Sequence, residues 1–167
     1  MEVKGLTKEY KRGTTPFLAV NNVNFSMDSD DFVSVVGHSG GGKSTLLNMI
    51  AGLLKPTSGS VTIQDQDVFA LSDEKGSFFR NSKIGYVPQG QGLLANLTVL
   101  ENVCLPFYLF KREGDVIPKA LSLLERMGIG SLAASYPRQL SGGEIRRVSI
   151  ARALINAPAL SGIQDAS

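Results

Sequence analysis

Cysteine, histidine and tryptophan are nearly missing from this sequence of 167 residues, which has one cysteine, one histidine and no tryptophan. A single cysteine, Cys104, excludes an internal disulfide framework and is typical of a reducing compartment. The first residues, Met1 to Gly5, contain no apolar segment of the kind found in a secretory signal peptide. We therefore expect a cytoplasmic protein that folds without a disulfide.

Long apolar runs and an excess of one charge are also missing. The longest apolar run, Val103 to Phe110, contains Pro106 and is much shorter than the roughly 20 residues of a membrane-spanning helix. The 17 Lys and Arg residues nearly balance the 15 Asp and Glu residues, which excludes the dense basic surface of a nucleic-acid-binding protein. A hydrophobic content of 43% excludes a disordered chain. These features predict a globular domain with no nucleic-acid partner.

Hydrophobic periodicity predicts strands in the first half of the chain and helices in the second. Alternation over residues 23–27 is typical of a half-buried strand, and the β-branched apolar run 32–36 predicts a buried central strand. Thr98 and Glu101 have the spacing of a helix capping box. An apolar stripe at helical spacing comprises Ile117, Ala120, Leu121, Leu124 and Met127. This order of elements predicts an α/β domain around a mixed sheet.

Glycine is what the sequence has in excess, and four of its 18 glycines lie within residues 37–42. Residues 37–44 satisfy the P-loop pattern G-x-x-x-x-G-K-[ST] between a predicted strand and a predicted helix. Glycines leave the backbone amides open to phosphate, Lys43 neutralises the β- and γ-phosphates, and the Ser44 hydroxyl suits Mg²⁺. The predicted phosphate-binding residues are Gly37, His38, Ser39, Gly40, Gly41, Gly42, Lys43, Ser44 and Thr45.

A second set of exposed amides occurs in residues 140–144, Leu-Ser-Gly-Gly-Glu, just before a predicted helix. Together with the P-loop and Gln89, this motif resembles the ABC transporter ATPases, whose signature reads LSGGQ or LSGGE. The resemblance extends from Val3 to about Leu160. Stretches 97–103 and 140–154 are most similar to the lipoprotein-releasing and macrolide-exporting ATPases of that family.

The resemblance implies an α/β P-loop NTPase fold of ABC type, with a mixed central sheet and a helical signature subdomain, incomplete at its C-terminal end. It implies a single nucleotide-binding domain over residues 1–167. Within it, residues 1–88 correspond to the P-loop core, residues 89–144 to the Q-loop and helical subdomain, and residues 145–167 to the signature helix and a degenerate end.

ATP and Mg²⁺ are the cofactors that the resemblance implies. Tyr10 corresponds to the aromatic residue that stacks on adenine, although packing on a sheet edge explains it equally well. Gln89, with Ser44, corresponds to a residue that reaches Mg²⁺. The signature residues would face the γ-phosphate of ATP bound by another subunit, in a head-to-tail homodimer or heterodimer of ATPase subunits; they are Ser141, Gly142, Gly143 and Glu144.

A transmembrane permease subunit is the further partner that the resemblance implies, which would place the chain on the inner face of the cell membrane. The apolar stretch 105–110 lies in the region that family members have near the coupling helices of the permease. Packing in the core explains this stretch equally well.

The resemblance ends after Leu160. Family members continue with an apolar strand ending in Asp-Glu and then a switch histidine, whereas here Gln164 stands at the Asp position and Asp165 at the catalytic Glu position. Ser161 and Gly162 should weaken that strand. Truncation of the gene product, favoured by the abrupt change, and a degenerate ATPase with a competent partner are both open. A neutral Gln164 cannot supply the charge that holds Mg²⁺, and Asp165 is one methylene too short for the general base. We therefore expect this chain to bind ATP poorly or transiently and to hydrolyse it at a negligible rate by itself.

The sequence therefore favours the ATP-binding subunit of an ABC transporter that powers export or lipoprotein release. The alternative is a non-hydrolysing remnant or interaction module that pairs with a complete ATPase subunit. A soluble ABC ATPase of translation or DNA repair is disfavoured, because residues 89–140 contain no zinc cluster or long coiled coil. A P-loop GTPase or small-molecule kinase would leave the signature without a role.

Overall fold

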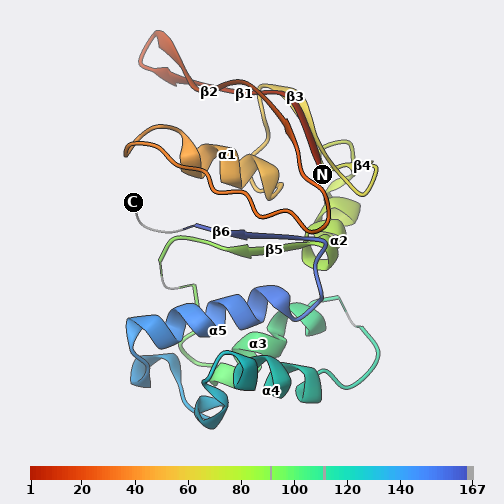
Figure 1. The fold of residues 1–167 in the computed structure, drawn as a ribbon, viewed down its shortest axis with the longest axis vertical. Coiled ribbons are helices and arrows are strands. Elements are labelled where there is room, and N and C mark those ends of the chain that lie inside the picture. Colours follow the sequence, from red (N-terminus) through yellow and green to blue (C-terminus); the bar gives the residue numbers. More distant parts are fainter. Residues whose placement is uncertain (91, 111, 165–167) are drawn as a thin grey trace. The chain divides into compact units, whose positions relative to one another are not determined.

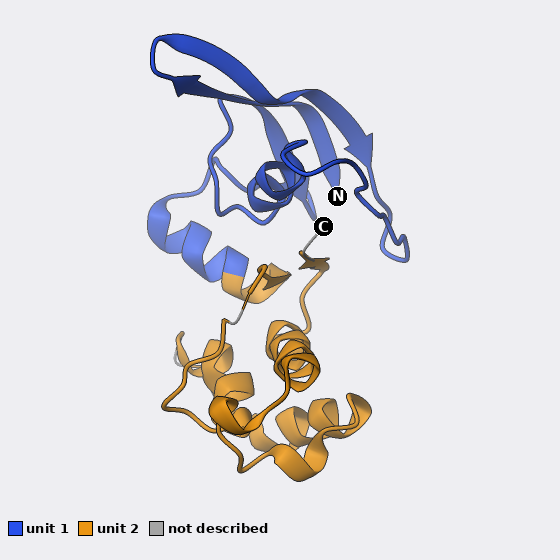
Figure 2. Cartoon of the chain, turned by 90° about the vertical axis from the view of Figure 1, so that its left-hand side faces the viewer, with its two compact units in different colours: residues 1–80, 167 blue, residues 81–166 orange. Residues whose placement is uncertain are grey.

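The computed structural model describes residues 1–90, 92–110 and 112–164. These residues form two compact units, the first covering residues 1–80 and the second beginning at Asn81 (Figure 2). Helix α2 (Asp73–Lys83) begins in the first unit and ends in the second. No helix in the described ranges is both long and apolar enough to cross a membrane.

The first unit is built on a four-stranded antiparallel sheet with the order β2-β1-β3-β4 (Figure 1). Its elements are β1 (Glu2–Arg12), β2 (Thr15–Ser26), α1 (Lys43–Ile50), β3 (Ser58–Ile63) and β4 (Gln66–Asp67). Its core residues alternate along β3, whereas those on β1 lie three positions apart; the core includes Val3, Leu6, Val61, Ile63 and, from α1, Met49 and Ile50.

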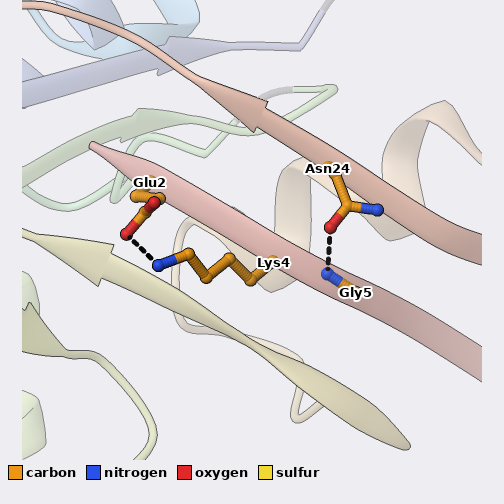
Figure 3. A network of polar contacts seen from close by, with 4 residues as sticks. All are labelled: Glu2, Lys4, Gly5 and Asn24. Atoms are coloured by element: carbon orange, nitrogen blue, oxygen red, sulfur yellow. Dashed lines mark hydrogen bonds and ion pairs between the residues drawn. The ribbon is translucent and has the colours of Figure 1, made fainter.

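A bulge interrupts β1 near its start, where the register with β2 shifts between Val3 and Leu6. Gly5 has a φ of 57°, a conformation that glycine adopts without strain. Its N–H donates to Oδ1 of Asn24 at 2.7 Å, and Glu2 pairs with Lys4 at 2.8 Å beside it (Figure 3). The Asn24 side chain thus satisfies an amide that the irregular register withdraws from the ladder.

The predicted central strand over residues 32–36 is wrong. This segment has no secondary structure, and Phe32 and Val36 are 94% and 85% exposed. The sheet of the first unit forms without this segment. A β-branched run becomes a strand only when a neighbouring strand accepts its backbone hydrogen bonds, and pattern alone does not supply that neighbour.

The second unit combines the parallel pair β5 (Ile84–Val87) and β6 (Leu160–Ile163) with three α-helices in its described residues. Figure 1 shows α5 (Gly142–Leu154) between this pair and helices α3 (Val99–Tyr108) and α4 (Ile117–Arg126). Two 3₁₀ turns, η1 (Gly130–Leu132) and η2 (Pro137–Gln139), connect α4 to α5. The helical core comprises Val99, Val103, Cys104, Ala120, Leu123, Leu124, Ile129, Val148, Ala151 and Ile155.

Local signals in the second unit are largely confirmed. Thr98 caps α3, accepting from the Glu101 N–H while the Glu101 carboxylate accepts from the Thr98 N–H. The stripe predicted on α4 is partly wrong, because Ile117 and Leu121 are exposed while Leu123 is buried. The helix turns its face towards α3 and α5, and that contact, not the sequence stripe alone, decides which residues are covered.

Strand β6 forms although we expected Ser161 and Gly162 to weaken it. Its four residues pair in parallel with β5, and Gly162 lies opposite Tyr86. A Cβ on Gly162 would stand 3.5 Å from the Tyr86 ring, an ordinary contact distance. The Tyr86 ring therefore does not require glycine at residue 162, and the strand forms because its backbone pairs with β5.

Candidate functional site

The glycine loop ahead of α1 is exposed and tightly turned. Gly40 and Gly42 have φ values of 77° and 81°, which residues with a Cβ atom rarely adopt. The Gly41 N–H donates to the His38 carbonyl at 3.1 Å and closes the turn. A Cβ on Gly42 would overlap the carbonyl oxygen of Ala19 on β2. The fold of the loop therefore requires glycine at residue 42, in addition to any requirement that a ligand reach the backbone amides.

Lys43 folds back across this loop. Its Nζ donates to the carbonyl of Gly37 at 2.7 Å and to that of His38 at 2.9 Å. The ammonium group thus covers the loop's carbonyl oxygens and leaves the loop with a net positive charge. Ser44 and Thr45 follow in the first turn of the helix, where their hydroxyl groups lie near its N-terminus.

The N-terminus of α1 lacks the usual devices that satisfy a helix end. Gly42 occupies the N-cap with no side-chain hydrogen bond, and the first turn has no acidic residue. Helix termini leave up to four amides to be satisfied by other groups, and the helix dipole favours an anion there. Together with the Lys43 ammonium, this end of α1 suits a phosphate group.

Tyr10 lies on β1 in the hairpin that precedes the loop. It stands opposite Phe17 of β2, with ring centroids 5.7 Å apart and ring planes at 27°. Lys8 Nζ lies 5.5 Å from the Tyr10 centroid, and Arg12 lies over Phe17 at 5.4 Å. Tyr10 therefore belongs to an exposed aromatic pair flanked by cations, so both the stacking and the sheet-packing interpretations stay open.

The predicted signature residues form the N-terminus of α5. Ser141 is the N-cap, and its N–H and hydroxyl both donate to Glu144 Oε2 at 2.7 Å. The Glu144 N–H lies 3.4 Å from Ser141 Oγ in return. Gly142 and Gly143 are exposed, with open space where a Gly142 side chain would lie. These two exposed glycines form the first turn of α5, whose amides have no acceptor within the helix, while the Ser141 hydroxyl donates to Glu144.

The carboxylate of this cap is stabilised in its charged form. The backbone N–H of Ser141, followed by its hydroxyl, lowers the pKa of Glu144 below its ordinary value, with a smaller contribution from Arg147. The equivalent cap on α3 lowers the pKa of Glu101 for the same reason, through Thr98. Both helices therefore begin with a carboxylate that stays ionised at neutral pH.

Gln89 and Gln164 meet at the carboxyl edge of the β5–β6 pair. Gln164 Nε2 lies 3.4 Å from Gln89 Oε1, and Gln164 Oε1 accepts from the Tyr86 hydroxyl at 2.7 Å. Burial raises the pKa of Tyr86, which therefore stays protonated and able to donate. We call Tyr86, Gln89 and Gln164 the edge cluster. Asp165, the other residue predicted here, lies outside the described residues.

The edge cluster does not fit a divalent cation. Mg²⁺ in proteins is bound through carboxylates and phosphates, whereas this cluster offers two neutral amides and a phenol. In residues 1–90, 92–110 and 112–164, no group of three or more His, Cys, Asp or Glu side chains is placed to hold a metal. Of the residues predicted for metal, Ser44 has a hydroxyl of suitable chemistry, and Gln89 has its oxygen engaged by Gln164.

Two residues that sequence reasoning missed hold the segment after Gln89. The buried Asn102 accepts from the Leu94 N–H at 2.8 Å, and its Nδ2 donates to carbonyl oxygens of residues 94, 97 and 98 at 2.9–3.1 Å. Arg152 donates to the Gly92 carbonyl at 2.6 Å, and burial lowers its pKa. The sequence signal for Asn102 was an asparagine within an apolar helical stripe. Arg152 had no such signal.

The apolar stretch 105–110 divides between the core and the surface. Phe107 packs against the helical core, while Tyr108 and Leu109 are 53% and 64% exposed. Asn81 and Asn156 donate to the carbonyl of Pro106, at 2.9 and 3.4 Å, and hold the end of α3. Core packing thus explains the apolar side chain of Phe107, but it does not explain those of the exposed Tyr108 and Leu109.

Comparison with known proteins assigns these features to one family. The family model described as ABC transporter matches residues 20–163. The chain is 39% identical over 161 residues to the lipoprotein-releasing system ATP-binding protein LolD of Pseudomonas syringae pv. tomato, covering 96% of this chain and 71% of the relative. It is 41% identical over 160 residues to LolD of Hydrogenovibrio crunogenus, covering 95% and 70%.

Solved structures of ABC transporter cassettes support the same family assignment. The dimeric structure of MJ0796, a bacterial ABC transporter cassette, superposes with a TM-score of 0.88 at 41% identity, covering 97% of this chain and 72% of that one. A dimeric post-hydrolysis state of MJ0796 bound to ADP and Pi superposes with a TM-score of 0.83 at 40% identity, with the same coverage. The predicted α/β fold of the ABC type is confirmed.

Proposed function

The chain belongs to the ABC transporter family of ATP-binding proteins, and we propose that it is the nucleotide-binding subunit of a lipoprotein-releasing transporter. The observation that carries the proposal is the N-terminus of α1, which combines an uncapped helix end, a glycine-lined loop and the Lys43 ammonium. These are groups that bind the phosphates of a nucleotide.

In this proposal each residue of the loop has a defined task. The amides of Gly40, Gly42 and Lys43 would donate to the phosphate oxygens, while the Gly41 amide holds the turn. Lys43 would leave the carbonyls of Gly37 and His38 to pair with the β- and γ-phosphates. The Tyr10–Phe17 pair offers an exposed ring face for adenine. The MJ0796 relative, whose structure holds ADP and Pi, supports a nucleotide ligand.

The signature at the start of α5 would act on a second copy or on another ATPase subunit. Gly142 and Gly143 expose amides at a helix N-terminus, a second anion-binding site that this chain's own loop does not need. A head-to-tail dimer would bring this end to the γ-phosphate held by the partner. The two MJ0796 structures are described as dimeric, which supports association of such cassettes.

Hydrolysis by this chain would be negligible even with ATP bound. The neutral Gln164 supplies no negative charge for a cation, and its amide is committed to Gln89 and Tyr86. Asp165, at the general-base position by resemblance, is one methylene shorter than glutamate, and loss of general-base catalysis lowers a rate by about 10²–10⁴-fold. The chain would then bind ATP and assemble, and turnover would depend on a complete partner subunit.

A permease in the membrane is the partner proposed for transport, with the chain on the cytoplasmic face. Tyr108 and Leu109 at the end of α3 form an exposed apolar pair that a membrane subunit could cover. The names of the curated relatives, which are ATP-binding proteins of a lipoprotein-releasing system, support lipoprotein as the cargo class.

Calorimetric titration with ATP tests nucleotide binding. Replacing Lys43 by Ala should weaken ATP affinity about 10–100-fold, the equivalent of a charge-assisted contact worth about 1.5–3 kcal/mol. The matched control is Lys119→Ala, which removes an exposed lysine on α4 and should leave the affinity unchanged. Failure of the wild-type chain to bind ATP, or equal affinity in both variants, would overturn the proposal.

The alternative, a non-hydrolysing module that pairs with a complete subunit, is favoured by the chemistry of Gln164. Mixing the chain with a hydrolysis-competent relative and measuring ATPase activity separates the two. Inhibition or stimulation that saturates near one chain per relative supports the module. Activity that is indifferent to the added chain removes it.

A further inference from the structure

Gln164 is the most firmly anchored residue of the edge cluster. Its backbone N–H donates to the Val87 carbonyl at 2.9 Å, which extends the β5–β6 ladder by one step. Its carbonyl accepts from Arg146 Nη2 of α5 at 2.9 Å. With both backbone groups engaged and the side chain buried, Gln164 has little freedom to move relative to the sheet.

The Tyr86 hydroxyl fixes how the Gln164 amide is turned. Because it donates to Gln164 Oε1 at 2.7 Å, the Nε2 end faces the opposite way, towards Gln89. A phenol whose pKa is raised remains a donor throughout the physiological range, so this orientation does not depend on pH there. Tyr86 thus sets the orientation of the Gln164 amide on which the contact with Gln89 depends.

Gln89 is the exposed and movable member. Its Oε1 lies 3.4 Å from Gln164 Nε2, a longer separation than the 2.7–3.2 Å of a strong N–H···O hydrogen bond. The contact therefore orients the Gln89 side chain, although less tightly than the 2.7 Å hydrogen bond from Tyr86 orients Gln164. An amide at residue 164 is essential for this arrangement, since a carboxylate accepts from Tyr86 but cannot donate to Gln89.

We propose that Gln164 is a positioning residue for Gln89, holding the Gln89 side-chain oxygen at the carboxyl edge of the β5–β6 pair and away from a divalent cation. The inference rests on the proposed function in one respect, because only in that function does Gln89 have a role near a divalent cation. Its test uses no nucleotide, so failure of ATP binding and failure of the positioning role are separate results.

The first measurement is the NMR signal of the Gln89 side-chain amide, identified by its loss in Gln89→Ala. In Gln164→Glu the isosteric carboxylate cannot donate, so Gln89 should turn its NH₂ group towards it and the signal should move. In Tyr86→Phe the Gln164 amide loses its orientation, and the Gln89 signal should move as well. Tyr108→Phe, the matched control on α3, should leave it in place.

The second measurement adds Mn²⁺ alone as a paramagnetic probe. The Gln89 signal of the wild-type chain should resist broadening. Half-broadening in Gln164→Glu should occur at about a tenfold lower Mn²⁺ concentration, because a carboxylate replaces the neutral amide and the Gln89 oxygen is released. Tyr86→Phe adds no charge, so earlier broadening in that variant isolates the release of Gln89.

A Gln89 signal that stays in place in both Gln164→Glu and Tyr86→Phe, in spectra of folded protein, would overturn the positioning role. So would equal Mn²⁺ broadening in the wild type and in both variants. A chain that binds no ATP but shows both expected responses would keep the positioning role and reject the proposed function.

Discussion

Gly42 lies so close to the carbonyl oxygen of Ala19 that even a methyl group at residue 42 would overlap it. The contact joins the end of the glycine loop to strand β2, and it comes with a φ of 81° at Gly42. The last glycine of the motif is thus required by its neighbour in the sheet hairpin, independently of the phosphate ligand that we propose for the loop.

Gly42→Ala should therefore destabilise the first unit by about 2–4 kcal/mol, since it combines steric overlap with a strained backbone. Chemical denaturation measures the loss. Gly40→Asn is the matched control, because Gly40 also has a positive φ but no atom within 4 Å of the Cβ position, and asparagine tolerates that φ. Equal stability of the two variants would contradict the role of Ala19.

Asn102→Leu should lower the free energy of unfolding by about 2–4 kcal/mol, because it leaves one amide and several carbonyl groups of residues 94–98 without their partner. Hydrogen exchange gives the specific readout. The Leu94 amide, which donates to Asn102 Oδ1, should exchange much faster in the variant than in the wild type, and more so than the Val103 amide in the middle of α3. Unchanged protection of Leu94 would count against the assignment.

The Glu144 cap predicts a pH dependence of stability. A pKa lowered in the folded state means that the stabilisation is present at neutral pH and is lost as the pH falls below the ordinary glutamate value of about 4.3 and through the lower folded value. The Glu144→Gln variant keeps a capping acceptor but does not titrate at this position. The wild-type melting temperature should fall more than that of the variant between about pH 6 and pH 3.

The control for this prediction is Glu113→Gln, a change outside both capping boxes. It should follow the wild-type pH profile. A Glu144→Gln profile parallel to the wild type across the acid range would show that the cap does not contribute.

Replacing both Tyr108 and Leu109 by Ser should reduce recruitment to membranes that contain the permease, because it removes the exposed apolar pair at the end of α3. The core residue Phe107 is left intact, so the fold should persist. Co-sedimentation with permease-containing vesicles measures recruitment. The double change Ile117→Ser and Leu121→Ser, also at exposed apolar positions, is the control; an equal loss there would contradict a specific docking surface.

Features that depend on neighbours in sequence were predictable. The glycine loop, the helix that follows it and the Thr98 cap each involve residues within a few positions of one another, so the residue types alone define their geometry. The signature motif likewise identified the start of α5, where Ser141 and Glu144 close their cap three residues apart. The family assignment came from these same local patterns.

The sequence by itself thus determined the glycine loop, the helix caps and the fold class, because turns, caps and glycine loops are set by local backbone preferences. Only the tertiary structure decided that residues 32–36 form no strand. It also decided that Asn102 holds the segment after Gln89 and that the Gln164 side chain contacts Gln89. Tyr86 and Gln164 are 78 positions apart, and Gln89 and Gln164 are 75 apart. Such pairs meet only when the parallel strands β5 and β6 align, and no local pattern encodes which strands will pair.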